Sequence, residues 1–361
     1  MITHLYVHIP FCPKVCPYCS FYKEASDRNK TQAFLDAVLA EAEAHGRMEG
    51  LETIFFGGGT PTALSTSQLD YLITGLRARL GFGDVPEFTL EMNPATVSLE
   101  KARALRDLGV NRVSMGVQSW DAGLLKTLGR VHSSEQAERS YHILREAGFD
   151  NINLDFIFGV PGQTPEQWAS TMEKTISLKT DHISSYCLTY EEDTEYFRRL
   201  GRGEYRVDEQ FDADMFELTM DRLEEAGFEQ YEISNYSRPG RECRHNLGYW
   251  LGEDYLGLGP SAFSTVGERR WKNVSDTLAY IAKIQAGEEA SDSLELLSET
   301  TKTAERLAFS LRTNRGVATN QLRPEAVAEM GALGLLRDDG ERSYLTRRGK
   351  MVADTVAETV F

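Results

Sequence analysis

Hydrophobic and polar positions repeat with two different periods along the first 190 residues. Short apolar runs predict strands at 5–9, 51–56, 87–92, 112–118, 152–158 and 182–190. Between them, apolar residues recur every three or four positions, which predicts helices at 29–45, 67–80, 99–108, 133–147 and 165–178. This strand–helix repetition predicts an α/β fold with a parallel sheet that is buried on both faces.

The rhythm changes after about residue 206. The later elements are expected as helices at 208–226, 277–286, 299–311 and 321–330, and as strand-like segments at 231–236 and 343–346. Residues 287–293 are predicted to be a linker before a compact pattern of two helices and a hairpin, which is similar to a winged helix. We therefore expect a core at 1–206, an extension at 207–290 and a small α+β domain at 291–361.

Composition narrows the class of protein. With 361 residues, 41% of them hydrophobic, the chain exceeds the usual single-domain size and can bury a sizeable core. The net charge of −16 argues against binding nucleic acid over the whole surface, because phosphate binding needs clustered Lys and Arg. No signal peptide follows Met1, and no apolar run approaches the roughly 18 residues of a membrane span. Five cysteines, three of them clustered, make no disulfide framework, so a reducing, cytoplasmic location is expected.

The three clustered cysteines, Cys12, Cys16 and Cys19, have the spacing C-x3-C-x2-C. Thiolates in such runs are the usual ligands of iron–sulfur clusters. A fourth cysteine is absent, because Phe21 stands where one would be sought. A four-iron cluster held by three cysteines leaves one iron with an open position for a substrate or cosubstrate, as in catalytic metal sites. The loop therefore predicts a 4Fe-4S cluster with these three cysteines as its protein ligands.

Two other interpretations of the loop are open. A zinc ion could take the three cysteines together with His4 or His8, or the three thiols could be unrelated buried groups. Zinc sites usually pair C-x2-C with a second ligand pair 12 or more residues further on, and the next hundred residues offer none. The cluster interpretation is therefore favoured.

Polar residues follow several of the predicted strands. The second strand ends in Gly57-Gly58-Gly59-Thr60, where the lack of Cβ atoms lets the backbone approach a ligand and offer its amide groups. Glu91 ends the third strand, Gln118 ends the fourth, Arg130 follows it, and Asp155 lies in the fifth. Each alone is more often an ordinary surface or loop residue. Ligands gather at the C-terminal ends of parallel strands, so together these residues predict a binding site on that rim.

The cysteine spacing resembles that of the radical S-adenosylmethionine (SAM) enzymes. The resemblance implies an open (β/α)6 partial barrel that holds a 4Fe-4S cluster and SAM, whose methionyl amine and carboxylate chelate the open iron. An electron from the cluster then cleaves SAM to a deoxyadenosyl radical. In that superfamily the glycine turn holds the methionyl amine, which implicates Gly58, Gly59 and Thr60.

A wider set of segments resembles the oxygen-independent coproporphyrinogen III dehydrogenase group. The matching positions are 6–21, 57–62, Glu91, 114–119, Arg130 and 153–162, and the resemblance covers nearly the whole chain. It implies a SAM site lined by Tyr6, Tyr18, Gly58, Gly59, Thr60, Glu91, Gln118, Arg130 and Asp155. Arg130 and Asp155 are expected to contact SAM without touching the cluster.

Three features distinguish this chain from the dehydrogenase itself and point to a sister branch of haem chaperones. In the dehydrogenase, the cysteine motif continues to a further cysteine at the position where this chain has Phe21. The dehydrogenase also carries an N-terminal extension before the first strand, which is missing here. The third feature is the motif H-N-x-x-Y-W, which is tied to haem binding in the sister branch. Its residues are His245, Asn246, Tyr249 and Trp250.

Each residue of this motif has an expected role. A neutral imidazole is a natural axial ligand of haem iron, so His245 is the expected ligand, with the Cys243 thiolate as its rival. Tyr249 and Trp250 are expected to stack on a porphyrin face, and Asn246 is expected to orient the imidazole. A lone histidine is more often structural than a ligand, and the surrounding motif is what favours contact with haem.

The resemblance implies a protein that binds haem and delivers it to haem-dependent proteins, membrane-associated respiratory enzymes among them. An electron donor such as flavodoxin or ferredoxin is the expected redox partner, and nucleic acid is not expected as a partner. The alternative function is oxidative decarboxylation of porphyrinogen propionates. A third interpretation is a radical SAM enzyme that acts on an unrelated small molecule.

Overall fold

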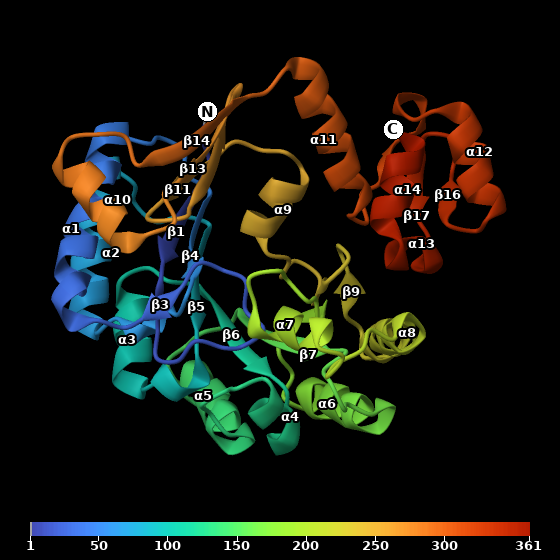
Figure 1. Ribbon diagram of the computed structural model, residues 1–361, viewed down its shortest axis with the longest axis horizontal. Coiled ribbons are helices and arrows are strands. Elements are labelled where there is room, and N and C mark those ends of the chain that lie inside the picture. The colour runs from blue at the N-terminus through green and yellow to red at the C-terminus, as the bar shows by residue number, and fades with distance from the viewer. Residues whose placement is uncertain (1) are drawn as a thin grey trace.

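The computed structural model describes residues 2–361 and is built around one sheet of twelve strands (Figure 1). From edge to edge the strands are β14 (Ser291–Leu296), β13 (Arg269–Asn273), β12 (Phe263–Val266), β11 (Tyr255–Leu258), β1 (His4–Ile9), β4 (Thr53–Gly58), β5 (Glu87–Met92), β6 (Arg112–Gln118), β7 (Ile152–Phe158), β8 (His182–Cys187), β10 (Asn235–Ser237) and β9 (Glu229–Gln230). The strands from β11 to β8 pair in parallel, and those at both ends pair antiparallel.

Helices cover the outer face of the parallel strands (Figure 1). They are α1 (Arg28–His45), α2 (Thr66–Leu80), α3 (Leu99–Asp107), α4 (Ala122–Thr127), α5 (Ser134–Glu146), α6 (Pro165–Ser177) and α8 (Glu209–Glu225), with α10 (Thr277–Gln285) against α1. Local sequence sets where several of them begin. Ser65, Ser133 and Thr164 each form a capping box at the start of α2, α5 and α6, because the side chain of each binds a free backbone N–H of the first turn.

The two faces of the parallel strands differ in chemistry. On β5, Phe88 and Leu90 lie in the apolar core under the helices, whereas Glu87, Thr89 and Glu91 alternate with them and point to the inside of the curved sheet. The same alternation places further polar side chains inside, namely Thr53, Arg112, Ser114, Asn153, Asp155, His182 and Ser184. The barrel therefore has an apolar outer layer and a polar interior.

Helix α9 (Arg244–Trp250) packs against β4 and separates the sheet from the C-terminal segment (Figure 1). Its N-terminus is held by Glu87, whose carboxylate oxygens accept the backbone N–H groups of Arg244 at 2.8 Å and His245 at 3.0 Å. A carboxylate at a helix N-terminus accepts hydrogen bonds from free backbone N–H groups and interacts favourably with the positive end of the helix dipole. The interior of the barrel thus fixes the position of the helix that carries the H-N-x-x-Y-W motif.

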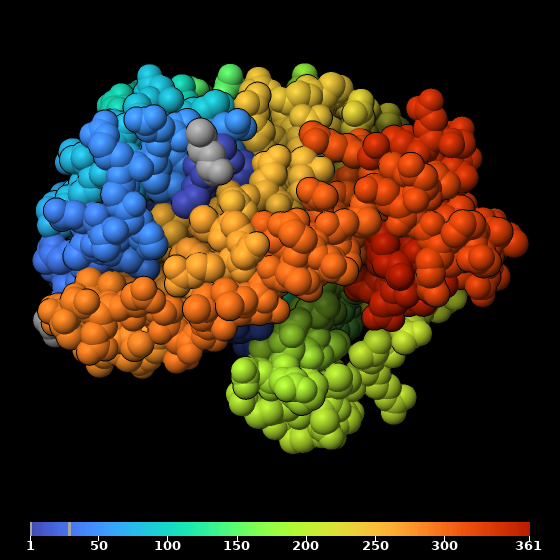
Figure 2. Space-filling view, turned by 90° about the horizontal axis from the view of Figure 1, so that it is seen from above, coloured from blue at the N-terminus to red at the C-terminus, as the bar shows by residue number. Residues whose placement is uncertain are grey.

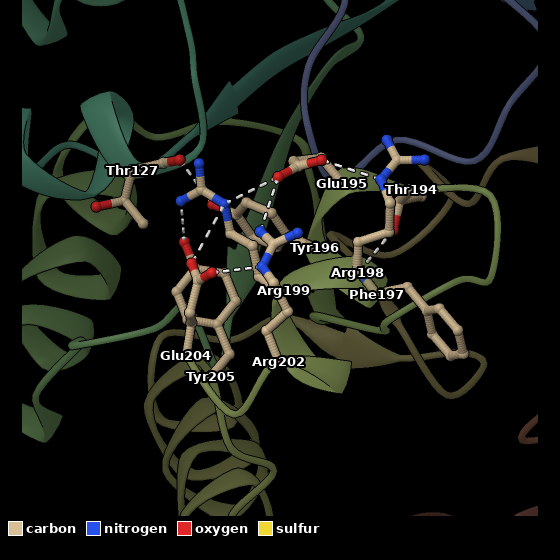
Figure 3. Close-up of polar contacts among 10 residues, drawn as sticks. All are labelled: Thr127, Thr194, Glu195, Tyr196, Phe197, Arg198, Arg199, Arg202, Glu204 and Tyr205. Carbon is tan, nitrogen blue, oxygen red and sulfur yellow. Dashed lines mark hydrogen bonds and ion pairs between the residues drawn. The ribbon is translucent and has the colours of Figure 1, made fainter.

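Helix α7 (Glu195–Gly201) follows β8 and lies against the cysteine loop (Figure 3). The backbone N–H of Tyr196 donates to the carbonyl of Pro17 at 3.2 Å, and its hydroxyl donates to the carbonyl of Thr127 at 2.6 Å. Glu195 pairs with three arginines of the same segment, namely Arg198, Arg199 and Arg202. This local network supports the loop from outside the barrel.

The C-terminal segment has a hydrophobic core of its own. Its elements are α11 (Glu299–Leu311), β15 (Val317–Ala318), α12 (Pro324–Ala332), β16 (Leu336–Asp338), β17 (Arg342–Leu345), α13 (Arg347–Met351) and α14 (Ala353–Val360). The three strands form a separate small sheet, and buried side chains from Leu311 to Val360 pack around it. Within residues 2–361, no helix is both long and apolar enough to cross a membrane.

The six strands and five helices expected in the first half are present, with shifted ends. The second expected strand extends to Gly58 as β4, and the sixth stops at Cys187. The linker expected at 287–293 is wrong in part, because β14 begins at Ser291 and pairs with β13 in the main sheet. The short elements β11 to β13, α4, α7 and α9 were not expected. The proposed three-part division of the chain stays a prediction.

Candidate functional site

The cysteine loop lies between β1 and α1, where the short strands β2 (Phe11–Cys12) and β3 (Glu24–Ala25) pair. Cys12, Cys16 and Cys19 are partly exposed and form no disulfide. Two of them face donors: Thr60 Oγ1 lies 3.5 Å from Cys12 Sγ, and Arg130 Nη1 lies 3.6 Å from Cys16 Sγ. Burial raises the pKa of the Cys12 and Cys19 thiols, so a bound metal is what would favour their thiolate forms.

The two histidines considered as zinc ligands make other contacts. The His4 ring nitrogens lie 2.7 Å from Thr53 Oγ1 and 2.5 Å from Glu253 Oε2, and His8 Nε2 donates to the carbonyl of Tyr22 at 2.8 Å. In the described part of the chain, no three His, Cys, Asp or Glu side chains gather closely enough to hold a single metal ion. A four-iron cluster does not need such a gathering, because each of its cysteines binds a different iron.

A cavity of about 700 Å³ opens beside this loop, at the C-terminal ends of the parallel strands. Figure 2 shows a hollow between the yellow-green segment near residue 200 and the orange and red segments of the C-terminal third. Eight of the nine residues expected for SAM line the cavity: Tyr18, Gly58, Gly59, Thr60, Glu91, Gln118, Arg130 and Asp155. The ninth, Tyr6, does not line this cavity. Its hydroxyl lies 3.1 Å from His8 Nδ1, and its side chain lines two other cavities, of about 610 Å³ and about 200 Å³.

The glycines that end β4 have a packing role beside their exposure in the cavity. A Cβ atom on Gly58 would lie 2.5 Å from the His8 ring, and one on Gly59 would lie 2.7 Å from the Pro10 backbone. Gly58 also has a φ of +101°, which side-chain-bearing residues rarely adopt. These glycines therefore allow the cysteine loop to pack directly on the end of β4, and this close approach places both segments on one cavity.

Carboxyl groups of Glu91, Asp155 and Glu191 line the cavity, and the first two lie on strands of the barrel. Burial, reinforced by the Asp155 carboxylate, raises the pKa of Glu91 to about 8. Burial also raises the pKa of Asp155, although Asp155 accepts hydrogen bonds from Ser114 Oγ at 2.9 Å and Asn153 Nδ2 at 2.7 Å. A ligand that brings positive charge between them would favour their ionised forms.

Arg130 and Gln118 lie at the end of β6. Arg130 Nη2 donates to the carbonyl of Gly116 at 2.8 Å, while its Nε is buried with no hydrogen-bond partner among residues 2–361. Gln118 has a φ of +67°, a conformation that is uncommon outside glycine and often found at binding sites. The guanidinium of Arg130 also contacts Cys16 Sγ, and the expectation that Arg130 does not touch the cluster itself stays a prediction.

The histidine of the H-N-x-x-Y-W motif is buried in the barrel. His245 is 1% exposed, its Nδ1 lies 2.6 Å from Thr53 Oγ1, and its Nε2 lies 2.8 Å from the Tyr249 hydroxyl. The ring stacks on Phe55 at 5.1 Å between centroids. The expectation that Asn246 orients the imidazole is wrong, because Thr53 and Tyr249 hold both ring nitrogens.

A second cavity of about 610 Å³ lies on the other side of Tyr249, between α9, α11 and strands β11 to β13. Tyr249 and Trp250 both line it. The Trp250 ring contacts Phe309 of α11 edge to face, at 6.1 Å between centroids. A smaller cavity of about 200 Å³, lined by His245, Asn246 and Tyr249 among others, continues from this region into the barrel.

Cys243, the rival haem ligand, is fully buried. Its Sγ lies 3.4 Å from Glu87 Oε1. Burial raises its pKa to about 12, against the opposing effect of Arg112. The thiol is therefore enclosed in the hydrogen-bond network inside the barrel and lines neither the 700 Å³ cavity nor the 610 Å³ cavity.

Comparison with known proteins agrees with this geometry. Residues 6–175 match the Radical SAM superfamily. Proteins called heme chaperone HemW are similar over almost the full chain: that of Lactococcus lactis is 35% identical over 98% of this chain and 96% of its own length, and that of Bacillus subtilis is 35% identical over 97% of each. The chain belongs to the HemW family of radical SAM proteins.

The HemW protein of Escherichia coli is 37% identical over 73% of this chain and 70% of its own length. Among solved structures, the radical SAM enzyme coproporphyrinogen III oxidase (HemN) from Escherichia coli matches with a TM-score of 0.85. That match covers 98% of this chain and 89% of the other, at 24% identity. The open β/α barrel expected from the sequence is thereby confirmed as the fold of this HemW-family chain.

The residues at the 700 Å³ cavity fit the cofactors of a radical SAM protein. The partnerless Arg130 Nε and the carboxyl groups of Glu91 and Asp155 offer partners for the carboxylate and the cationic groups of SAM, and the three free cysteines offer ligands for a 4Fe-4S cluster. When bound, the cluster supplies a one-electron reductant beside SAM. The side chains named here would hold both groups on one rim.

Sequence reasoning missed several residues of the site. Ser114, Tyr186 and Ser234 line the 700 Å³ cavity, and Asn153 links Ser114, Asp155 and Ser184 through hydrogen bonds. Ser114 and Asn153 alternate with apolar residues in their strands. A strand that is buried between two apolar layers would be apolar throughout, so this alternation indicated that one face of the sheet is polar.

Replacing Cys12, Cys16 or Cys19 with Ala should remove the iron–sulfur absorption after anaerobic reconstitution, since one iron would lose its thiolate. Iron and sulfide analysis measures the result. The matched control is Cys187→Ala combined with Cys243→Ala, which should retain about four irons per chain. A cluster that survives the loss of Cys16, or that needs Cys187, contradicts the assignment.

Glu91→Gln should weaken SAM binding roughly ten- to hundredfold, because it removes a charged partner of the ligand. It should also raise the melting temperature of the ligand-free protein. Because folding raises the pKa of Glu91 to about 8, the stability that its protonated form gives the protein is lost as pH rises from the usual carboxyl pKa to about 8. The gain in melting temperature should therefore be larger near pH 9 than near pH 5. Thermal melts and SAM titration measure both effects.

Glu41 is the control for Glu91. It is another buried carboxyl group, and burial raises its pKa to about 7, but it binds Tyr280 and Asn273 under α10, away from the cavity. Glu41→Gln should leave SAM affinity unchanged. Unchanged SAM affinity in Glu91→Gln would show that this rim does not bind SAM.

Proposed function

We propose that this protein binds haem and delivers it to haem-dependent proteins, while a 4Fe-4S cluster and SAM occupy the rim of its barrel. The similarity to proteins called heme chaperone HemW, which extends over nearly the whole chain, supports this function. The observation that carries it is the aromatic second cavity next to the H-N-x-x-Y-W motif.

The second cavity has an aromatic lining that suits a porphyrin. Haem is a flat apolar macrocycle, and aromatic side chains are its natural partners. The aromatic residues that line the cavity are Tyr6, Phe21, Tyr22, Tyr249, Trp250, Tyr255, Phe263 and Phe309. Phe21 and Phe263 are 67% and 46% exposed, which is unusual for phenylalanine unless a ligand or partner covers it.

The same cavity offers charge for the haem propionates. Lys272, Arg306, Arg270 and Lys302 all line it. Arg270 pairs with Glu305 and Glu295, and Lys302 pairs with Asp254. Lys272 and Arg306 form no ion pair with any residue from 2 to 361, so these two cations are the proposed partners of the two carboxylates.

The 700 Å³ cavity and the 610 Å³ cavity share lining residues. Ser20 and Phe21 line both, so the loop that carries the cluster cysteines also borders the proposed haem site. We assign Cys12, Cys16 and Cys19 to the cluster. The proposed SAM residues are Tyr18, Gly58, Gly59, Thr60, Glu91, Gln118, Arg130 and Asp155, with Tyr6 behind them, and the proposed haem residues are His245, Tyr249 and Trp250, with Asn246 beside them.

His245 remains the proposed axial ligand, with a condition set by the structure. Because its Nε2 binds the Tyr249 hydroxyl, iron reaches this nitrogen only after Tyr249 turns away. Tyr249 lines both the 610 Å³ cavity and the 200 Å³ cavity that contains His245, so its movement would join the two spaces.

The proposal includes partners and location. Haem acceptors, membrane-associated respiratory enzymes among them, would take the cargo, and an electron donor such as flavodoxin or ferredoxin would reduce the cluster. A reducing cytoplasm suits a cluster held by partly exposed cysteines. Nucleic acid is not proposed as a partner, in keeping with the net charge of −16.

The alternative function is oxidative decarboxylation of coproporphyrinogen III, and the fold shared with coproporphyrinogen III oxidase favours considering it. A porphyrinogen would fit the same cavity. The relatives that cover the chain carry the chaperone name, and Phe21 stands in place of a further cysteine at the wall between the cavities. We therefore place the chaperone function first.

The reconstituted protein should not decarboxylate coproporphyrinogen III. An anaerobic assay with SAM and a reductant, followed by chromatography of the porphyrins, measures this. Coproporphyrinogen III oxidase run in parallel is the positive control. Protoporphyrinogen formed at more than about one equivalent per chain would contradict the chaperone function and support the enzyme.

His245→Ala should shift or remove the Soret band of the haem-loaded protein while iron–sulfur absorption persists, because the iron loses its imidazole. Trp250→Ala should weaken haem binding less, since loss of one stacking face costs about 1–3 kcal/mol by analogy with base stacking. Haem titration followed by absorption measures both.

Cys243→Ala is the matched control and should leave the Soret band unchanged. If Cys243→Ala loses the band and His245→Ala keeps it, the thiolate is the ligand. If neither variant changes it, α9 does not ligate haem.

A further inference from the structure

Five side chains form one continuous chain of hydrogen bonds that runs through the barrel interior and has both of its ends, Glu253 and Tyr249, at the second cavity. Glu253, which is 46% exposed, lies 2.5 Å from His4 Nε2, and His4 Nδ1 lies 2.7 Å from Thr53 Oγ1. Thr53 Oγ1 lies 2.6 Å from His245 Nδ1, and His245 Nε2 lies 2.8 Å from the Tyr249 hydroxyl. Neither the cysteine loop nor the SAM cavity takes part in this chain.

The chemistry of the groups gives the chain one direction when both histidines are neutral. The Glu253 carboxylate only accepts, so His4 Nε2 carries its proton and His4 Nδ1 accepts from the Thr53 hydroxyl. Thr53 has a single hydrogen, so its oxygen must accept from His245 Nδ1–H. The remaining nitrogen, His245 Nε2, then has a free lone pair that accepts from the Tyr249 hydroxyl.

The surroundings support a neutral His245. The His245 ring is 1% exposed, and the partners of its two nitrogens are the uncharged hydroxyls of Thr53 and Tyr249. Phe55 stacks on one face of the His245 ring, and the His245 and His4 rings meet edge to face at 5.9 Å between centroids. The imidazole is therefore fixed in orientation as well as in protonation.

We propose that Glu253, His4 and Thr53 are positioning residues that set the tautomer of His245 and leave its Nε2 lone pair for the iron of a haem in the second cavity. This inference rests on the proposed function. Histidines that bind metals are commonly oriented by a carboxylate or carbonyl on the far nitrogen. Here a three-residue relay has that role, and Tyr249 protects the lone pair until haem arrives.

The tautomer can be measured without haem. In protein labelled with nitrogen-15 histidine, a protonated ring nitrogen and one with a lone pair give well-separated NMR signals, and His245→Ala identifies the relevant pair. We expect protonated Nδ1 and unprotonated Nε2 in His245. The opposite tautomer in the wild-type protein would overturn the inference.

Thr53→Val keeps the size of the side chain and breaks the relay. We expect the His245 tautomers to become mixed, haem affinity to fall about tenfold, and the iron–imidazole stretching frequency of the ferrous haem complex to change. Thr53→Ser should restore all three. Thr175→Val, which removes a hydroxyl that is equally buried but bonded within α6 and to Trp120, should change none of them.

If Thr53→Val does not fold, Glu253→Gln at the exposed end tests the same relay and should also mix the tautomers. An unchanged tautomer in both variants would overturn the inference. The two proposals fail differently: a protein that shows the expected tautomer but takes up no haem refutes the haem function, whereas tight haem binding with the opposite tautomer refutes the relay alone.

Discussion

The structure depends on satisfying polar groups inside its barrel. A buried polar group without a partner destabilises a protein, by about 1–3 kcal/mol for a neutral group and more for a charged one. Arg112 and Glu87 are both buried in this interior, and Glu87 finds its partners in the first turn of α9. The helix is thereby fixed against β4. The position of His245, Tyr249 and Trp250 follows from where that helix begins.

Two cavities, each a proposed ligand site, border the cysteine loop. The parallel strands end at the 700 Å³ cavity, where Glu91, Asp155 and Arg130 converge, while α9 and α11 enclose the 610 Å³ cavity. Phe21 lies between them, at the position where the related dehydrogenase is expected to have a cysteine. An aromatic side chain there extends the surface that a porphyrin can cover.

Sequence alone predicted the strands and helices of the first half because their hydrophobic periods are long and regular. It also predicted that the polar residues at the strand ends would converge, and eight of the nine proposed SAM residues line one cavity. It could not predict that Thr53 and Tyr249, rather than Asn246, hold the His245 ring. The Thr53 contact joins residues 192 positions apart, and nothing local in the sequence specifies such a pairing. The Tyr249 contact is local, because the two residues lie four positions apart on α9. Only the first three residues of β14 fell in the expected linker, and most residues of this edge strand are exposed, so burial imposes no apolar pattern on it.

The central claim is that haem binds between α9 and α11, apart from the SAM cavity. Hydrogen–deuterium exchange of the cluster-containing protein, with and without haem, tests this claim most directly. We expect haem to slow exchange in Arg244–Trp250 and Glu299–Leu311 and to leave Pro324–Ala332 unchanged. Protection confined to the strand ends around Glu91 and Asp155, or to the C-terminal helices, would contradict it.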